Sequence, residues 1–245
     1  MYLSVLEVGA EQLPKLALVC GDPRRAALIA TKLTDAKELA FAREYRTFVG
    51  TYEGVAVAVV SHGVGSAGAA VCFEELIKGG IETIIRVGTA GSYTADIPAG
   101  SLVVSTASVR AEGLTKQLVP DGFPAVADGA VTNALYEAAT ALGGGVVAKG
   151  ITLTLDVFFN GVVEFPHKLY KAAGVLAVEM EIAALYVIAS LRGVKAGAII
   201  AIDGYADSDL AAEYNPHTNA VSDAVEREII AALDALVLLS ATTTA

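Results

Sequence analysis

The sequence is poor in cysteine, histidine and charged residues, and these scarcities exclude several classes of protein. Two cysteines cannot build a disulfide framework, and together with three scattered histidines they show no spacing typical of a zinc site. Charged residues make up only 18% of the chain, with a formal net charge of −10. We therefore expect no metal, and no nucleic acid as main partner, because phosphate backbones are bound by clustered lysine and arginine.

Long hydrophobic runs are also missing. A membrane helix needs about 18 or more consecutive apolar residues, and the longest candidate, IIAALDALVLLSA, is interrupted by Asp234. The stretch MYLSVLEVGAEQLPK has no basic region and contains Glu7 and Glu11, so we expect no secretory signal and a cytoplasmic location. Hydrophobic residues still make up 54% of the chain, and we expect subunit interfaces to bury part of that excess.

Apolar, β-branched runs alternate with helical patterns along the chain. Strands are expected at 15–20, 55–61, 83–88, 101–109, 145–157 and 196–204, and helices at 24–33, 67–80, 131–144, 178–193 and 222–241. The strands are continuously apolar, which indicates a sheet covered on both faces. With no linker or repeat, the sequence predicts an α/β fold: a single domain over residues 1–245, with a central mixed, twisted sheet flanked by helices on both faces.

A glycine-rich stretch, SHGVGSAGAA, follows the apolar run VAVAVV and has the G-x-G-x-x-G spacing of a dinucleotide-binding loop. Such a loop also needs an acidic residue about 20 positions further on, at the carboxyl end of the next strand. Glu82 has that spacing but precedes the strand at 83–88, so it belongs to the wrong end. We therefore favour a tight strand-to-helix turn, whose glycines also let a ligand approach the backbone closely.

Two arginines lie near predicted strand ends. VCGDPRRA places Gly21, Asp22 and Arg25 after the first strand, and IIRVGTAGS places Arg86 within a strand and Thr89 in the following turn. A buried strand rarely carries arginine, because an unpaired charge is costly there. Arg86 therefore needs an anionic partner. That partner is either an internal carboxylate such as Asp22 or a bound oxyanion, for which two guanidiniums, a hydroxyl and backbone N–H groups are suited.

Three carboxylates add to these strand ends. Asp203 follows the apolar strand at 196–204 and is expected at the mouth of a pocket, where burial would raise its pKa and make it a proton donor; a capping or turn role is the alternative. Glu179 and Glu181, in VEMEIAA, are expected on the helix 178–193. Two positions apart, they would point to different sides, one toward a pocket and the other toward an arginine.

Taken together, these motifs resemble one family. The segments are CGDPRR, SHGVGSAG, FEEL, IIRVGTAGS, TASVRAEG, FPAVAD, AVEMEIAAL and IDG. They are similar, in order and over about residues 15–240, to the nucleoside phosphorylases of the trimeric and hexameric class. The similarity is strongest to the small purine nucleoside phosphorylases of the apicomplexan type, while TASVRAEG and FPAVAD are equally similar to uridine phosphorylases.

The resemblance implies phosphorolysis of a nucleoside to a free base and a pentose 1-phosphate, with inorganic phosphate as co-substrate and no cofactor. It also implies a homo-oligomer, a hexamer built as a trimer of dimers. By the same resemblance, Gly21, Arg25, Arg86 and Thr89 would bind phosphate, and Arg43 would reach the site of a neighbouring subunit.

The resemblance further implies a nucleoside site. Its residues would be Val64, Phe158, Glu179, Met180, Glu181 and Asp203. Met180 and Glu181 would hold the ribose hydroxyls, and Asp203 would protonate N7 of the leaving purine. The catalytic residues would thus be Asp203, Arg86 and Glu181.

Two departures from the family pattern bear on substrate choice. The family supplies a histidine near the N-terminus to the 5′-hydroxyl, and this chain has Val5 there, so we expect an apolar 5′ pocket that tolerates 5′-methylthio nucleosides. The bacterial hexameric enzymes carry an arginine soon after the aspartate, and here the first one is Arg227. The polar segment 205–219 is expected to form a lid instead.

Three alternatives remain open at this stage. Uridine phosphorylases use a Gln-x-Arg pair that FFNGVVEFPHK lacks, and they lack the aspartate at position 203, although Thr89 leans toward them. A hydrolytic nucleosidase would tend to lose the phosphate-binding arginines, and a nucleoside-binding protein would not need Glu181 and Asp203. We favour purine nucleosides, inosine and guanosine first and adenosine second.

Overall fold

The structure is a computed structural model that describes residues 1–159, 161–206 and 215–243. Within these residues ten strands form one mixed sheet. They are β3 (Leu16–Cys20), β4 (Thr34–Ala42), β5 (Tyr45–Tyr52), β6 (Val55–Ser61), β7 (Thr83–Ser92), β8 (Leu102–Arg110), β9 (Ala125–Val126), β10 (Val147–Thr154), β11 (Ala177–Glu179) and β12 (Lys195–Tyr205). A separate antiparallel pair joins β1 (Tyr2–Leu3) and β2 (Val8–Gly9).

Strand order explains where a ligand site can form. Along the sheet the order is β11, β10, β8, β12, β7, β3, β6, β5 and β4, with β9 on β8. Because β11 pairs with both β10 and β7, five strands close into a ring, and the remaining strands extend from β7 as an open sheet. Four neighbours, β12, β7, β3 and β6, run parallel, so their carboxyl ends meet at one edge.

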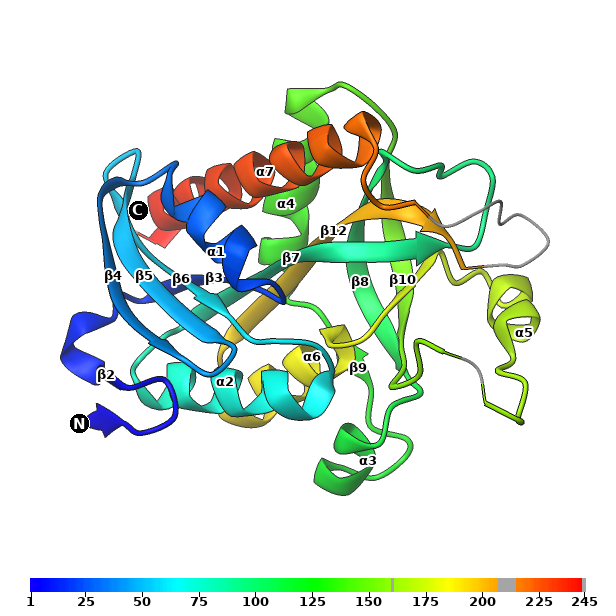
Figure 1. Cartoon of the computed structure of the whole chain (residues 1–245), viewed down its shortest axis with the longest axis horizontal. Coiled ribbons are helices and arrows are strands. Elements are labelled where there is room, and N and C mark those ends of the chain that lie inside the picture. The colour runs from blue at the N-terminus through cyan, green and yellow to red at the C-terminus, as the bar shows by residue number, and fades with distance from the viewer. Residues whose placement is uncertain (160, 207–214, 244–245) are drawn as a thin grey trace.

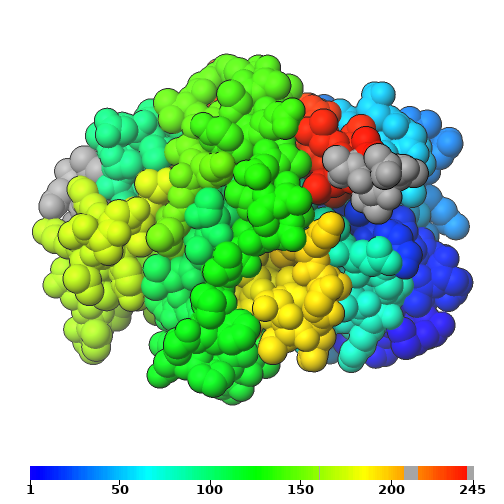
Figure 2. Space-filling model, turned by 180° about the vertical axis from the view of Figure 1, so that it is seen from behind, coloured from blue at the N-terminus to red at the C-terminus, as the bar shows by residue number. Residues whose placement is uncertain are grey.

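Helices cover both faces of this sheet, as predicted. They are the short 3₁₀ helix η1 (Ala10–Gln12), α1 (Pro23–Ala30), α2 (Ser66–Lys78), α3 (Leu114–Leu118), α4 (Gly129–Leu142), α5 (His167–Ala172), α6 (Ile182–Arg192) and α7 (Asn219–Thr243). Figure 1 shows α1, α4 and α7 on one side of the sheet and α2 and α6 on the other. The N-terminal segment and α5 lie at opposite ends of the molecule, in the front view and from behind (Figures 1 and 2).

Burial on both faces follows from the continuous apolar runs in the strands. In β12, Ile199 belongs to the core under α1, α4 and α7, while Ile200 belongs to the core under α2 and α6. Each is completely buried, although adjacent strand residues point to opposite faces. A half-exposed sheet would have required alternating polar residues here, so the sequence pattern and the two-faced core agree.

Two expectations about local structure were wrong, and one hairpin was not predicted. The hairpin of β4 and β5 was missed, because its residues are largely half-buried or exposed and lack an apolar run. The strand expected at 83–88 continues to Ser92, so that Thr89 lies within β7 rather than in a turn. The helix expected at 178–193 begins only at Ile182, after β11 and a non-helical Glu181.

None of the helices in the described part of the chain combines the length and the apolar composition needed to cross a lipid bilayer.

Candidate functional site

Several of the predicted site residues, Gly21, Val64 and Asp203 among them, lie at or just after the carboxyl ends of the four parallel strands. The loop after β6 runs beside the loop after β3, since His62 N–H donates to the Cys20 carbonyl at 2.8 Å and Gly63 N–H donates to the Gly21 carbonyl at 3.1 Å. A Cβ at Gly21 would lie 3.1 Å from the Gly63 carbonyl oxygen. The close approach of these two backbones therefore explains why the loop after β3 begins with glycine.

Arg86 is the centre of this site. Its side chain is only 4% exposed, and its Nη2 contacts both Glu181 and Glu179, the latter at 3.2 Å. The predicted alternative partner, Asp22, instead caps α1 by accepting from Arg24 N–H at 2.8 Å. Within the described residues, Nε and Nη1 of Arg86 have no hydrogen-bond partner. One nitrogen of the guanidinium is thus paired with two carboxylates, and its other two nitrogens remain unsatisfied donors within the described residues.

The two glutamates converge on Arg86 instead of pointing to different sides of a helix. Glu179 ends β11 and accepts from the backbone N–H groups of Glu181 and Ile182, at 2.7 and 2.9 Å, and from Thr154 Oγ1 at 2.5 Å. Those bonds hold the chain out of helical geometry at Glu181, which is why the helix prediction was wrong here. Both carboxylates consequently face the same guanidinium.

Burial and charge act differently on these two carboxyls. Burial raises the pKa of Glu179, which Arg86 offsets only in part. Burial is the largest single influence on Glu181 and opposes its ionisation, but the Arg86 guanidinium and the hydrogen bond from Gly65 N–H are among the influences that together outweigh it and hold the pKa of Glu181 below its usual value. Glu181 also accepts from Gly65 N–H at 2.5 Å. Glu181 is therefore the ionised acceptor of the pair, oriented by the glycine loop.

The glycine loop makes the predicted strand-to-helix turn. Gly63 and Gly65 have φ values of 75° and 95°, which favour glycine, and α2 begins directly after Gly65. The N–H group of Gly65 donates its hydrogen bond to Glu181. Glu82 lies before β7 and forms an ion pair with Lys15 at 2.6 Å. The geometry thus agrees with the interpretation that this is not a dinucleotide loop.

Arg25 lies in the first turn of α1 and has a partner that the sequence analysis missed. Its Nη1 is 3.5 Å from Oε1 of Glu228, a fully buried residue of α7. The helical spacing offered a signal, because Glu228 shares its stripe with the buried Val221, Ala224 and Ala231. A glutamate on an apolar stripe requires an internal cation.

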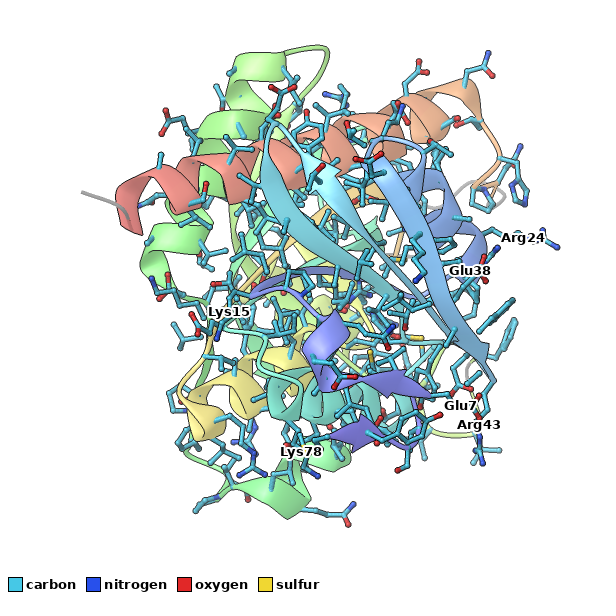
Figure 3. All side chains as sticks on the ribbon, turned by 90° about the vertical axis from the view of Figure 1, so that its left-hand side faces the viewer. Glu7, Lys15, Arg24, Glu38, Arg43 and Lys78 are labelled. Carbon is cyan, nitrogen blue, oxygen red and sulfur yellow. The ribbon has the colours of Figure 1, made fainter. Side chains whose placement is uncertain are left out.

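The remaining candidates lie around this centre. Asp203 is 8% exposed near the end of β12, and the Met180 carbonyl accepts from Ser66 Oγ at 2.8 Å. Val64 and Phe158 are 79% and 65% exposed, so neither lines an enclosed pocket within this chain. Arg43 lies at the turn between β4 and β5, is exposed, and points outward at the edge of the molecule (Figure 3).

Two sequence expectations concern the region after Asp203. Of the lid expected at 205–219, residues 207–214 lie outside the described residues. Arg227 donates to the carbonyl of Gly143 at 3.0 Å and to that of Gly100. These bonds tie α7 to two loops, so the first arginine after the aspartate is engaged structurally.

Other features of the described residues do not extend the site. One surface hollow lies between α4 and α7 and another beside η1, β4 and β5, and neither contains a predicted site residue. Among the residues with described positions, no group of three or more histidine, cysteine and acidic side chains is arranged to hold a metal ion. His62 is completely buried, and burial lowers its pKa to about 4, so it is neutral at physiological pH.

Known proteins resemble the chain over most of its length. A purine nucleoside phosphorylase of Plasmodium falciparum is 39% identical over 201 residues, 81% of this chain and 82% of that protein. A uridine phosphorylase of Thermococcus kodakarensis is 40% identical over 200 residues, 77% and 72% of the two chains. The crystal structure of purine nucleoside phosphorylase from Toxoplasma gondii in complex with immucillin-H superimposes with a TM-score of 0.91 at 30% identity, covering 97% and 96% of the two chains.

The model of the phosphorylase superfamily matches residues 15–241. This range contains every strand of the main sheet, and it contains both arginines, Arg25 and Arg86, with their carboxylate partners. The α/β fold with its central mixed sheet, predicted from the sequence, is the fold of these relatives. The chain belongs to the phosphorylase superfamily.

Proposed function

We propose that this enzyme catalyses phosphorolysis of purine nucleosides, converting nucleoside and inorganic phosphate into free base and ribose 1-phosphate. One observation carries the proposal: within the part of the chain that the structure describes, buried Arg86 keeps Nε and Nη1 without partners while its Nη2 is held by two carboxylates. Unsatisfied guanidinium donors at buried strand ends suit a tetrahedral oxyanion. The proposed chemistry uses phosphate as co-substrate and requires no other cofactor.

Phosphate is proposed to bind between Arg86 and Arg25, with Gly21 and Thr89 beside them. The Arg25 guanidinium exchanges its 3.5 Å contact with Glu228 for the anion. That contact is longer than a good charge-assisted hydrogen bond, so the exchange replaces a weak interaction with a stronger one. The bound dianion then lies under the sugar as the attacking nucleophile.

Ribose is proposed to bind at Glu181, with Glu179 and the Met180 segment beside it. Cleavage of a glycosidic bond builds positive charge on the sugar ring. An ionised Glu181 accepts hydrogen bonds from the ribose hydroxyls, and its negative charge and that of phosphate stabilise the developing cation. Arg86 contacts Glu181 and, through its other donors, phosphate. It therefore sets the distance between the two reacting molecules.

The leaving base is proposed to be protonated at N7 by Asp203. A purine anion is a poor leaving group unless its developing charge is neutralised. Asp203 is only 8% exposed, and burial of a carboxyl favours its protonated form. Phe158 and Val64 are proposed to cover the base, both being exposed apolar side chains that a ligand or a neighbouring subunit can bury.

A neighbouring subunit is proposed to complete the site, in a hexamer arranged as a trimer of dimers. Arg43 is exposed at a hairpin turn with φ of 54° and points away from its own chain. A strained turn that presents an arginine outward suits delivery of a cation to another subunit's phosphate.

Uridine phosphorolysis is the second candidate, because a uridine phosphorylase is as similar to this chain as a purine enzyme. Asp203 supports the purine reading, since only a purine offers N7. Asp203 does not distinguish purines that differ at the 6-position, because all of them offer N7. Inosine and guanosine are proposed over adenosine by the family resemblance alone.

A substrate panel with and without phosphate tests these choices. We expect inosine to be cleaved with a kcat/KM about tenfold or more above that for uridine, and only when phosphate is present. Because Val5 replaces a histidine, 5′-methylthioinosine is expected to be a substrate comparable with inosine. Base release undiminished without phosphate would identify a hydrolase, a preference for uridine would identify the second candidate, and no cleavage would leave a binding protein.

Gly88→Ala tests whether Arg86 must occupy its observed place. A Cβ at Gly88 would lie 1.8 Å from Arg86 Nη1, so the methyl group has to displace the guanidinium. We expect kcat/KM to fall about 100-fold, as misplacement by about 1 Å can cause, and the thermal midpoint to fall as well, because a displaced guanidinium pairs less well with the buried Glu179 and Glu181. Gly129→Ala in α4 is the matched control, because its added Cβ would meet no other element of the described structure within 4 Å. Equal activities of the two variants would contradict the assignment.

A further inference from the structure

Glu228 brings a carboxylate into the interior beside the arginine pair. Its side chain is fully buried. Oε2 accepts from Ala201 N–H of β12 at 3.0 Å and from Gly88 N–H of β7 at 3.3 Å. Oε1 lies 3.5 Å from Arg25 Nη1 and has no hydrogen-bond partner within the described residues. One oxygen is thus anchored to the sheet, and the other faces Arg25.

The Glu228 carboxylate is held by the kinds of donor that would hold a bound anion. Two backbone N–H groups and a guanidinium are the donors that a phosphate oxygen would use. While Arg25 keeps its 3.5 Å contact with Oε1, a phosphate that approaches Arg25 to about 3 Å comes within about 7 Å of Oε1. At that separation in a buried site, two negative charges repel appreciably.

We propose that Glu228, in its ionised form, is an internal counter-anion of the phosphate site, which neutralises Arg25 while the site is empty and weakens phosphate binding. The inference rests on the proposed phosphorolysis and assigns to Glu228 the control of phosphate affinity. Without Glu228, the positive charges of Arg25 and Arg86, which both act on Glu228, would have less compensation, at a cost to the stability of the empty enzyme.

The charge state of Glu228 sets the conditions of the test. The titratable and charged groups facing it are Arg25 from α1, Arg86 from β7 and Cys20 from β3. Burial raises the pKa of Glu228 to about 8, and burial also raises the pKa of the Cys20 thiol to about 12. At pH 9 Glu228 is mainly ionised, Cys20 is neutral and phosphate is a dianion, so the repulsion is then largest.

Glu228→Gln removes the charge and keeps an oxygen for the two backbone N–H groups. At pH 9 we expect the KM for phosphate to fall about tenfold, since one nearby negative charge is lost, while kcat changes by less than about twofold. The thermal midpoint without phosphate should fall, and its rise on adding phosphate should exceed that of the unmodified enzyme. Glu226→Gln is the control, because Glu226 is a half-exposed residue of α7 that pairs with Lys32. It should change neither the KM for phosphate nor the rise of the thermal midpoint on adding phosphate.

The outcomes separate the inference from the function on which it rests. If the unmodified enzyme needs no phosphate, the proposed function fails. If it needs phosphate but folded Glu228→Gln has an equal or higher KM, only the inference is overturned. Should the variant not fold, calorimetry on the unmodified enzyme at pH 9 decides the matter. Phosphate binding must then take up protons, because the dianion raises the pKa of Glu228 further, and the absence of proton uptake would overturn the inference.

Discussion

Arg86→Gln is expected to lower kcat/KM for inosine phosphorolysis by about a thousandfold, because the substitution removes an electrostatic contact to the transition state in a buried site. Phosphate loses the free Nε and Nη1 donors, and Glu181 loses the cation that orients it. Both the KM for phosphate and kcat should change. The measurement is steady-state kinetics with phosphate and inosine varied separately.

Stability must be measured beside activity for this variant. Glu179 and Glu181 are both buried, and removing their shared cation leaves two uncompensated carboxyls, at a cost of about 3 kcal/mol or more. Arg86→Lys is the matched variant, because it keeps the charge but cannot contact two carboxylates and phosphate with one planar group. The activity of Arg86→Lys should lie between those of the unmodified enzyme and Arg86→Gln. A folded Arg86→Gln enzyme with an unchanged KM for phosphate would remove Arg86 from the site.

Asp203→Asn should lower kcat on inosine by about 100-fold or more, a usual contribution of a general acid. The amide cannot deliver a proton to N7, while its size leaves the strand packing of β12 intact. The KM for phosphate should change little, because Asp203 does not contact phosphate in the proposed mechanism. Near-normal turnover of the variant would exclude the assigned role.

A substrate that needs no proton separates acid catalysis from a structural role. An N7-methylated purine nucleoside already carries a positive charge on its base, and its base leaves without protonation. Asp203→Asn should therefore cleave 7-methylinosine almost as fast as the unmodified enzyme does. An equal loss on both substrates would instead show that Asp203 supports the site structurally.

The position of the candidate site follows from local sequence, because strand ends are local features. Gly21, Arg86 and Asp203 each follow or end an apolar run, and parallel strands bring such positions to one edge. The need of Arg86 for an anionic partner was likewise predictable, since an arginine within a buried strand is too costly to leave unpaired.

The partners of the arginines could not be predicted in the same way. Glu228 is 203 positions beyond Arg25, and only the packing of α7 against the sheet brings them together. The convergence of Glu179 and Glu181 depends on where α6 begins, and backbone N–H groups bonded to Glu179 decide that. Helix boundaries of this kind depend on tertiary hydrogen bonds, which periodicity does not contain.

A crystal structure of the enzyme grown with phosphate and inosine measures the central claim most directly. The account predicts a phosphate within about 3 Å of Arg86 Nε or Nη1 and of the Arg25 guanidinium, with Glu181 on the ribose hydroxyls and Arg25 moved away from Glu228. A phosphate bound elsewhere, with Arg25 still on Glu228 and the Arg86 edge unoccupied, would contradict it.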